Sequence, residues 1–370
     1  MGTTNSASRQ VREPRGWFPR RTKFIVPVLS GIGLALGFWA SAGKTTGAAQ
    51  QPPVSSALLC EGYAGLPQGD DGHAGMALVR GGKFLMGSND HYAEEAPAHR
   101  VKVSDFLIDK HAVTNVQFKK FVEATGYVTL AERMPYFKYE PELPALMRQP
   151  GSAVFVMPDG TEFGRWRYVQ GASWRSPTGP GSNIENLMNH PVVHVAYEDA
   201  LAYAKWAERD LPTEAQWEYA ARGGFDNMPY VWGAAFAPDG KTMANTWQGE
   251  FPFENELTDR YMGTSPVGCF PPNGYGLYDM AGNVWQWTST WFRPEHDSRE
   301  ARDPQGPDEA ESYDPRSPGV PAKVIKGGSH LCAANYCARY RPSARQARET
   351  NSGTSHIGFR TVINMAKEIN

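Results

Sequence analysis

The stretch Lys326-Gly-Gly-Ser-His-Leu-Cys332-Ala-Ala-Asn-Tyr-Cys337-Ala-Arg-Tyr-Arg341 holds two of the chain's four cysteines, five positions apart. This spacing fits no regular element, because positions i and i+5 face opposite sides of a strand and lie well apart around a helix. In a fully extended chain the two α-carbons would be roughly 16 Å apart. For the sulfurs to act together the chain must turn back, and Gly327-Gly328 supplies backbone freedom for that turn.

The chemistry of the two thiols allows three interpretations. They could form a small-loop disulfide, stay two unrelated thiols, or form a paired-thiolate site for a soft metal such as Cu(I). Nearby cations such as Arg339 and Arg341 would lower the thiol pKa values, and the thiolate is the form that binds metal or attacks. Chemistry alone leaves all three interpretations open.

This stretch, followed by His356-Ile-Gly-Phe-Arg360, closely resembles the end of the formylglycine-generating enzymes, which modify sulfatases. Most members of the wider superfamily keep the Gly-Phe-Arg ending but lack the cysteine pair, so the resemblance is specific. It runs from about Gly75 to the C-terminus and implies an α+β fold related to C-type lectins, with little regular secondary structure. The other segments that carry it are Gly171–Arg175, His190–Val195, Leu211–Arg222, Trp247–Pro252 and Pro271–Tyr278.

The composition is that of a folded, loop-rich protein. Hydrophobic residues make up 41% of the chain, enough for a sizeable core, and 38 glycines and 29 prolines predict short strands joined by loops. The net charge of −2 gives no electrostatic reason to expect nucleic acid as a partner. Four cysteines are too few for a disulfide scaffold, so the pair at 332 and 337 favours chemistry, although an oxidising compartment would permit a disulfide between them.

The N-terminal part predicts export. Residues 1–23 are basic, and residues 24–42 form an uncharged stretch close to the minimum that spans a bilayer. This pattern fits a cleaved signal peptide or an uncleaved membrane anchor, and either would place the domain on the periplasmic or extracellular face. Residues 43–74 are small and polar and predict a linker, in which Cys60 has no expected function.

Residues 75–370 are expected to form one domain that begins with strands. Alternation around a glycine turn predicts a β-hairpin over residues 76–87, and residues 101–108 predict another strand. Residues 127–190 show no clear period, and so long an irregular segment inside a domain is usually functional.

Three helices are expected within this domain. Capping boxes at Thr114 and Thr213 predict two of them, ending at Gly126 and at Gly223-Gly224. Residues 197–209 predict the third, with Leu201, Ala204 and Trp206 facing inward.

The resemblance implies that Cys332 and Cys337 bind Cu(I), which the thiolate of a substrate cysteine joins as a further ligand. Oxygen is then activated, a hydrogen leaves the β-carbon of the substrate cysteine, and the thioaldehyde hydrolyses to the aldehyde of Cα-formylglycine. Ser329, Tyr336 and Trp285 are implied to line the pocket for oxygen and the substrate thiol, although plain core packing explains Trp285 equally well.

The resemblance also implies two Ca²⁺ sites, built from the hard oxygen ligands that this ion prefers. Asn and Asp favour loops in any case, so the residue types alone are weak support. The implied ligands are Asn245, the Thr246 carbonyl, Asp259 and the Tyr261 carbonyl in the first site, and Asp279, the Gly282 and Val284 carbonyls and Gln286 in the second. In the second site Asp and Gln stand where relatives more often carry Asn and Glu.

The implied substrate is an unfolded sulfatase segment with the sequence Cys-x-Pro-x-Arg. An extended peptide needs backbone hydrogen-bond partners and side-chain pockets, and aromatic and Arg residues are the usual anchors of such surfaces. The expected groove residues are Trp174, Trp247, Arg339 and Arg341, whereas His330 is interpreted as a local hydrogen-bonding residue.

The preferred hypothesis is therefore a copper-dependent oxidase, and two alternatives remain. A nonheme-iron sulfoxide synthase of the same superfamily would need a histidine cluster, which relatives usually carry on a separate helical domain that is not recognised here. A non-catalytic lectin-like binding or envelope-assembly module would make Cys332–Cys337 a structural disulfide.

Overall fold

The computed structural model describes residue 60 and residues 62–69, 72–135 and 144–365. The expected basic region 1–23, the apolar stretch 24–42 and most of the linker lie outside the described residues. Within them, no helix combines the length and apolar character needed to cross a bilayer.

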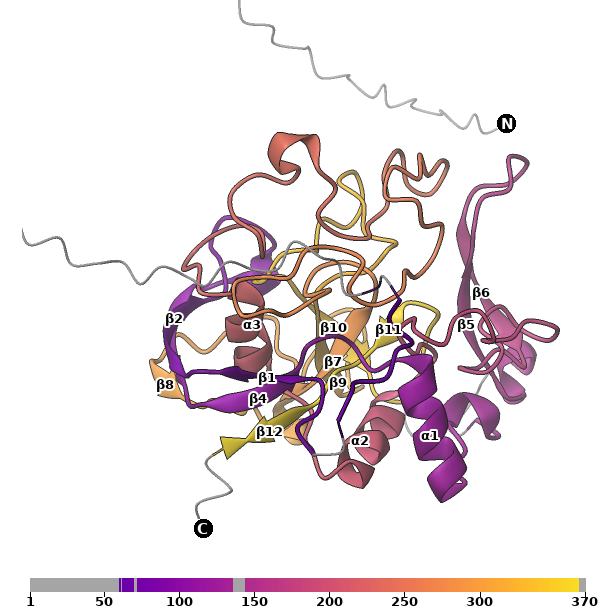
Figure 1. Cartoon of the computed structure of the whole chain (residues 1–370), viewed down its shortest axis with the longest axis horizontal. Coiled ribbons are helices and arrows are strands. Elements are labelled where there is room, and N and C mark those ends of the chain that lie inside the picture. The colour runs from indigo at the N-terminus through magenta and orange to yellow at the C-terminus, as the bar shows by residue number, and fades with distance from the viewer. Residues whose placement is uncertain (1–59, 61, 70–71, 136–143, 366–370) are drawn as a thin grey trace, which may run out of the picture. The chain divides into compact units, whose positions relative to one another are not determined.

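The described chain is an α+β fold built on several small sheets (Figure 1). The sheets have the strand orders β10-β9-β7-β11, β1-β4-β12, β2-β3-β8 and β5-β6. The strands are β1 (Met76–Val79), β2 (Gly82–Met86), β3 (His99–Val103), β4 (Phe106–Asp109), β5 (Gly151–Val156), β6 (Arg165–Gln170), β7 (Trp285–Trp291), β8 (Ala301–Arg302), β9 (Ala322–Lys326), β10 (Arg345–Glu349), β11 (Ile357–Gly358) and β12 (Val362–Asn364). The short strands and long connections agree with the glycine- and proline-rich composition.

The expected hairpin over residues 76–87 is wrong. β1 and β2 do not pair with each other; β1 pairs antiparallel with β4, and β2 pairs antiparallel with β3. The two segments therefore form one ribbon that bends at Gly81, whose backbone N–H donates to the Asp105 carboxylate at 2.8 Å. The alternation correctly indicates strands, but these strands pair with the next segment of the chain, residues 99–109, rather than with each other.

The helices are α1 (Asn115–Thr125), α2 (Tyr197–Trp206) and α3 (Glu214–Arg222). The two expected capping boxes are confirmed, because the hydroxyls of Thr114 and Thr213 accept the backbone N–H groups of Gln117 and Gln216. Gly126 and Gly223 end α1 and α3 in the left-handed conformation.

The third expected helix forms but is shorter than predicted. Its residue Trp206 is 42% exposed rather than inward-facing. The helix ends at this residue, and the ring rests against Phe121 of α1 with the centroids 5.5 Å apart. Figure 1 shows α1 and α2 side by side below the sheets.

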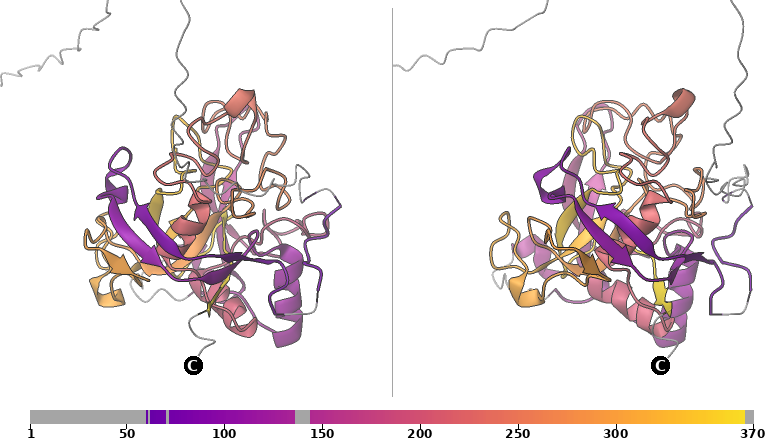
Figure 2. Two further views of the ribbon diagram at one scale, coloured as in Figure 1. Left: turned by 60° about the vertical axis from the view of Figure 1, so that its left-hand side comes forward. Right: turned by 90° about the vertical axis from the view of Figure 1, so that its left-hand side faces the viewer.

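Two features refine the expected irregular segment 127–190. Gly151–Val156 and Arg165–Gln170 pair as the hairpin β5-β6, which projects from the body of the domain (Figures 1 and 2). The rest of the described part of this segment consists mainly of turns and short 3₁₀ helices. The segment thus presents a two-stranded arm rather than an unstructured loop.

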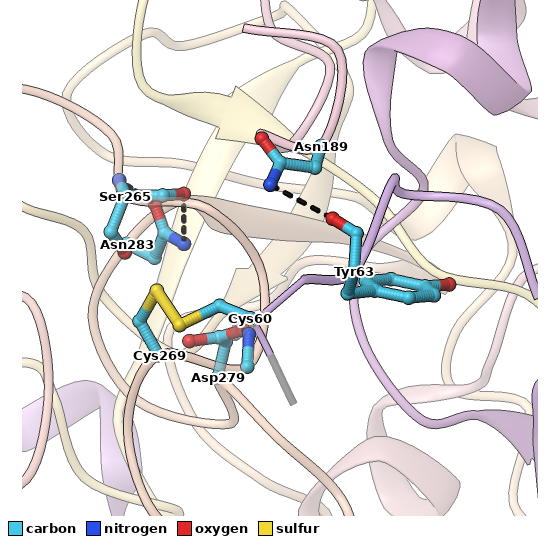
Figure 3. The surroundings of a disulfide bond; sticks show 8 residues. Cys60, Tyr63, Asn189, Ser265, Cys269, Asp279 and Asn283 are labelled. Atoms are coloured by element: carbon cyan, nitrogen blue, oxygen red, sulfur yellow. Dashed lines mark hydrogen bonds between the residues drawn. A yellow bond between two sulfur atoms is a disulfide. The ribbon is translucent and has the colours of Figure 1, made fainter. Parts of the chain in front are cut away.

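A disulfide joins Cys60 to Cys269, which corrects the expectation that Cys60 has no function (Figure 3). The residues that follow are packed on the domain: Asn189 donates to the Tyr63 carbonyl at 3.0 Å, and the Thr114 hydroxyl donates to the Gly65 carbonyl at 2.7 Å. The bond therefore holds the beginning of the described chain to a loop more than two hundred residues away.

Candidate functional site

The thiol loop, residues 327–341, starts from a buried ion pair. Lys326, the last residue of β9, donates to the Glu218 carboxylate of α3 at 3.0 Å, and both side chains are fully buried. Gly328 (φ 70°) then lies against the backbone of residues 339–340, where a Cβ would stand 3.0 Å from the Arg339 carbonyl oxygen. Only glycine allows this close approach, which turns the chain back on itself.

Two turns inside the loop bring the cysteines together. The Cys332 N–H donates to the Ser329 carbonyl, and the Cys337 N–H donates to the Ala333 carbonyl, both at 2.9 Å. The two sulfur atoms lie 2.8 Å apart, both cysteines are buried, and both are free thiols. The reversal expected from the sequence is confirmed.

Ion pairs also hold the far end of the loop. The Arg339 guanidinium donates to the Glu94 carboxylate at 2.6 Å and stands 3.9 Å over the Tyr92 ring. Arg341 is buried and donates to Glu95 at 2.8 Å. The expectation that Arg341 lines a substrate groove is therefore wrong, because its guanidinium is enclosed and serves to anchor the loop.

The two thiols differ in acidity. Burial raises the pKa of Cys332 well above its usual value, so Cys332 keeps its proton and is assigned as the donor in the hydrogen bond between the two sulfurs. That hydrogen bond, together with the Arg339 guanidinium, lowers the pKa of Cys337 to about 7. Two adjacent buried sulfurs, one of which loses its proton readily, form a donor set that fits a soft monovalent metal such as Cu(I).

This asymmetry predicts selective alkylation of the metal-free protein. Below pH 7 Cys337 is mostly a thiol, and above it the reactive thiolate dominates, so iodoacetamide should modify Cys337 with a midpoint near pH 7. Cys332 should react far more slowly at every pH below 9, because burial disfavours its thiolate. Peptide mapping by mass spectrometry across pH 5–9 measures the labelling of each cysteine. Equal labelling of the two cysteines would contradict the assignment of Cys337 as the more acidic thiol.

The three residues expected to line the pocket occupy different positions. Ser329 is buried, and its hydroxyl accepts the Leu331 N–H at 3.2 Å. Tyr336, the residue before Cys337, is 59% exposed and forms the surface edge of the thiol loop, here called the rim. Its ring stacks on Phe251, with the centroids 4.3 Å apart. Trp285 is a buried residue of β7 in the same apolar cluster as the two cysteines.

Neither of the two tryptophans expected in the groove is on the surface. Trp174 is fully buried against Phe118, with the ring centroids 5.2 Å apart, so its assignment to the groove is wrong. Trp247 is 3% exposed; its backbone N–H donates to the Cys332 carbonyl at 3.1 Å, and its indole N–H to Glu254. Trp247 therefore packs beneath the surface and holds the thiol loop through its backbone, and it does not anchor a peptide.

A surface that the sequence did not reveal extends from the rim toward the β5-β6 arm. Its exposed members are Phe163, Trp166, Phe253 and Tyr336, here called the aromatic patch. The patch rests on a buried layer that includes Phe155, whose ring lies 5.4 Å from Trp166 and 5.3 Å from Phe251. These aromatic residues stand singly in the sequence and form no pattern there, so only the contacts in the fold bring their segments together.

The first implied calcium set fits a hard cation. The side-chain oxygen of Asn245 is buried and has no hydrogen-bond partner, as expected of a ligand atom. Next to it, the Gln248 amide nitrogen contacts the Thr246 carbonyl, the Thr246 hydroxyl and the Asp259 carboxylate. The backbone N–H of Tyr261 closes the turn by donating to Asp259 at 2.9 Å. Oxygens of Thr246 and Asp259 thus gather around one amide group, and the adjoining residue Asn245 carries an unpartnered oxygen, a set of donors that suits Ca²⁺.

The second implied set does not fit. The Gln286 side-chain oxygen already accepts the Trp217 indole N–H at 2.9 Å and the Arg360 guanidinium at 2.7 Å. Asp279 accepts the Gly268 N–H at 2.7 Å, and its backbone carbonyl accepts Arg360. Gly282 and Val284, whose carbonyls would be the other two ligands, lie between Asp279 and Gln286 in the sequence. The buried Arg360 guanidinium already carries a positive charge where the ligands would have to meet a cation. No cluster of three or more His, Cys, Asp or Glu side chains suited to a metal ion occurs among the described residues.

Comparison with known proteins agrees with this geometry. Residues 65–365 match the family described as Sulfatase-modifying factor enzyme 1-like domain. The formylglycine-generating enzyme of Mycobacterium tuberculosis is 50% identical over 289 residues, which cover 76% of this chain and 95% of that protein. A mouse relative named inactive C-alpha-formylglycine-generating enzyme 2 is 38% identical, covering 78% of this chain and 86% of that protein. The solved structure of PvdO from Pseudomonas aeruginosa has the same fold, with a TM-score of 0.54 and 23% identity over 80% of this chain and 97% of that one. The chain belongs to the sulfatase-modifying factor enzyme family.

Proposed function

We propose that this protein is a copper-dependent oxidase that converts the cysteine of a sulfatase Cys-x-Pro-x-Arg segment to Cα-formylglycine, using oxygen. The observation that carries the proposal is the pair of buried sulfurs 2.8 Å apart in the thiol loop. A structural role alone does not explain two free thiols in a chain whose other cysteines form a disulfide. The formylglycine-generating enzymes among its relatives support the substrate class.

Each part of the loop has a role in this reaction. Cys332 and Cys337 would hold Cu(I), which supplies the activation of oxygen. The hydrogen bond with Cys332, together with the charge of Arg339, favours the thiolate form of Cys337, and the buried layer around Trp247 limits the access of water. Oxygen takes one hydrogen from the carbon and one from the sulfur of the substrate cysteine, which leaves a carbon–sulfur double bond. Two thiols of the reductant supply the other two hydrogens and become a disulfide, so that oxygen leaves as two molecules of water. Water then replaces sulfur, and hydrogen sulfide leaves.

Mass spectrometry of a synthetic Cys-x-Pro-x-Arg peptide tests this function. The full-length protein, loaded with Cu(I) and supplied with oxygen and a thiol reductant, should replace the peptide's CH₂SH group by CHO. Omitting copper or oxygen should stop the conversion. An unchanged peptide, incubated with folded protein that holds one copper per thiol pair, would favour a non-catalytic binding module.

The aromatic patch is proposed to bind the peptide beside the reactive thiols. Trp166 is exposed on β6, and aromatic faces are favourable surfaces for proline and for arginine. Replacing it in Trp166→Ala should raise KM for the peptide about tenfold, or about 1.4 kcal/mol, with a smaller effect on kcat. The control is Trp206→Ala, which removes a similarly exposed indole on α2. Equal KM values for both variants would remove the patch from the substrate site.

We further propose one Ca²⁺ per chain, held by Asn245, Asp259 and the carbonyls of Thr246 and Tyr261. Isothermal titration should give a stoichiometry of one, and chelation should lower the melting temperature. Asp259→Asn removes a charged ligand and should abolish both effects. Asp279→Asn, the equivalent change in the set that does not fit, should leave calcium binding unchanged; a stoichiometry of two would contradict this assignment.

The Cys60–Cys269 disulfide supports export of this domain. Disulfides persist in oxidising compartments, so the bond agrees with the signal peptide or membrane anchor expected at residues 24–42. Modification would then take place outside the cytoplasm, on client segments that have not yet folded.

A further inference from the structure

A cavity of about 940 Å³ lies apart from the thiol loop and from both calcium sets. Its walls come from β2, β3, α3, β7, β10 and the loop of residues 293–301. None of the residues implicated above in copper, calcium or peptide binding lines it. Two of the chain's nine histidines, His99 and His296, do so.

The two imidazole rings face each other at short range. Their centroids are 5.1 Å apart, with an angle of 46° between the planes. The Nδ1 atom of His99 lies 3.0 Å from the Pro97 carbonyl. Because a carbonyl only accepts, Nδ1 carries the proton, and in the neutral ring Nε2 is left with its lone pair. An imidazole held by a carbonyl in this way is the usual arrangement of a metal-binding histidine.

His296 offers a second free nitrogen. Its Nε2 atom is buried and has no hydrogen-bond partner, which is costly for a polar atom unless a ligand completes it. Burial lowers the pKa of His296 well below its usual value, and the cations Arg345 and Lys326 lower it further. The ring is therefore neutral near pH 7, so a metal ion can bind without displacing a proton. Both cations are paired with buried carboxylates, Glu214 and Glu218, which offset the repulsion that they would exert on a metal ion. The backbone N–H of His296 donates to the Ala96 carbonyl at 3.0 Å, which ties it to the segment that bears His99.

We propose that His99 and His296 form a second metal site, which takes a divalent transition ion such as Zn²⁺, Ni²⁺ or Cu²⁺. Imidazole nitrogen prefers these ions, whereas the thiol pair prefers soft Cu(I). No third His, Cys, Asp or Glu joins the two rings in the part of the chain that the structure describes. Water in the cavity therefore completes the coordination, and the site keeps open positions.

The test is metal binding to full-length protein that carries no polyhistidine tag. Cys332→Ser/Cys337→Ser is the parent, because it removes the thiols that would also bind these ions. Calorimetric titration with ZnCl₂ and with NiCl₂ should show one site, and adding His99→Gln or His296→Gln should weaken it on the order of tenfold or more. His91→Gln, at an exposed histidine of a neighbouring loop, is the matched control and should bind like the parent.

A spectroscopic measurement identifies the ligands. Cu²⁺ bound to the same parent should give an electron paramagnetic resonance spectrum with coupling to imidazole nitrogen, reduced in both glutamine variants. His99 is only partly buried, so His99→Gln should fold normally even if His296→Gln does not. A parent that binds neither Zn²⁺ nor Ni²⁺, or a folded His99→Gln variant that binds them as tightly as the parent, would overturn the proposal.

Discussion

Replacing either Cys332 or Cys337 by serine is expected to reduce peptide conversion by on the order of 10³-fold or more, because catalytic groups that act as a unit fail together. The double variant should be no worse than either single one. Folding should be little affected, since neither sulfur is in a disulfide and each change swaps one atom in a buried loop. A loss of about 1 kcal/mol would lower the melting temperature by only about 2–4 °C. Conversion assays and calorimetry on the same samples provide both measurements.

The matched control is Ala334→Ser, which adds a hydroxyl at an exposed position between the two cysteines. It should keep full activity. The result that refutes a shared metal site is a single serine variant that retains conversion within a few-fold of the parent. Loss of activity accompanied by a large fall in melting temperature would instead point to the structural role of a binding module.

The sequence predicted the centre of the site better than its surroundings. The reversal of the chain at the thiol loop was predictable from two cysteines and two glycines within sixteen residues. The close approach of Gly328 to residues 339–340 that produces it involves only this short stretch of the chain. The capping boxes at Thr114 and Thr213 are local in the same sense. Each requires only residues within one turn, so short-range patterns were sufficient to place them.

Long-range packing could not be read in this way. Arg341 and Trp174 looked like surface anchors, and both are buried because Glu95 and Phe118 come from distant segments to enclose them. The bent ribbon of β1-β2 with β3-β4 has the alternation of a hairpin, and only its pairing distinguishes the two. The partner of Cys60 was hidden for the same reason, since no local pattern relates it to Cys269.

That disulfide leads to the second large effect, a loss of about 2–4 kcal/mol in the free energy of unfolding when Cys60 or Cys269 is replaced by serine. The bond spans a sequence separation of 209 residues, so it restricts the unfolded chain over most of the domain. In the folded state it also keeps in place the loop that carries Gly268, and the N–H of Gly268 donates to the buried Asp279 carboxylate at 2.7 Å. Urea denaturation of the full chain, followed by tryptophan fluorescence, measures the loss.

The two single variants and the double variant should lose the same free energy, because each removes the same bond. A thiol reductant should reproduce this loss in the unmodified protein and leave the variants unchanged, since Cys332 and Cys337 are already thiols. The double variant and the reduced protein have no unpaired Cys60 or Cys269 that could form a wrong disulfide, so they show whether such a bond affects the single variants. If reductant had no effect on the unmodified protein, the hydrogen bonds that Tyr63 and Gly65 make with Asn189, His111 and Thr114 would be enough to hold this segment, and the disulfide would contribute nothing to the stability of the domain.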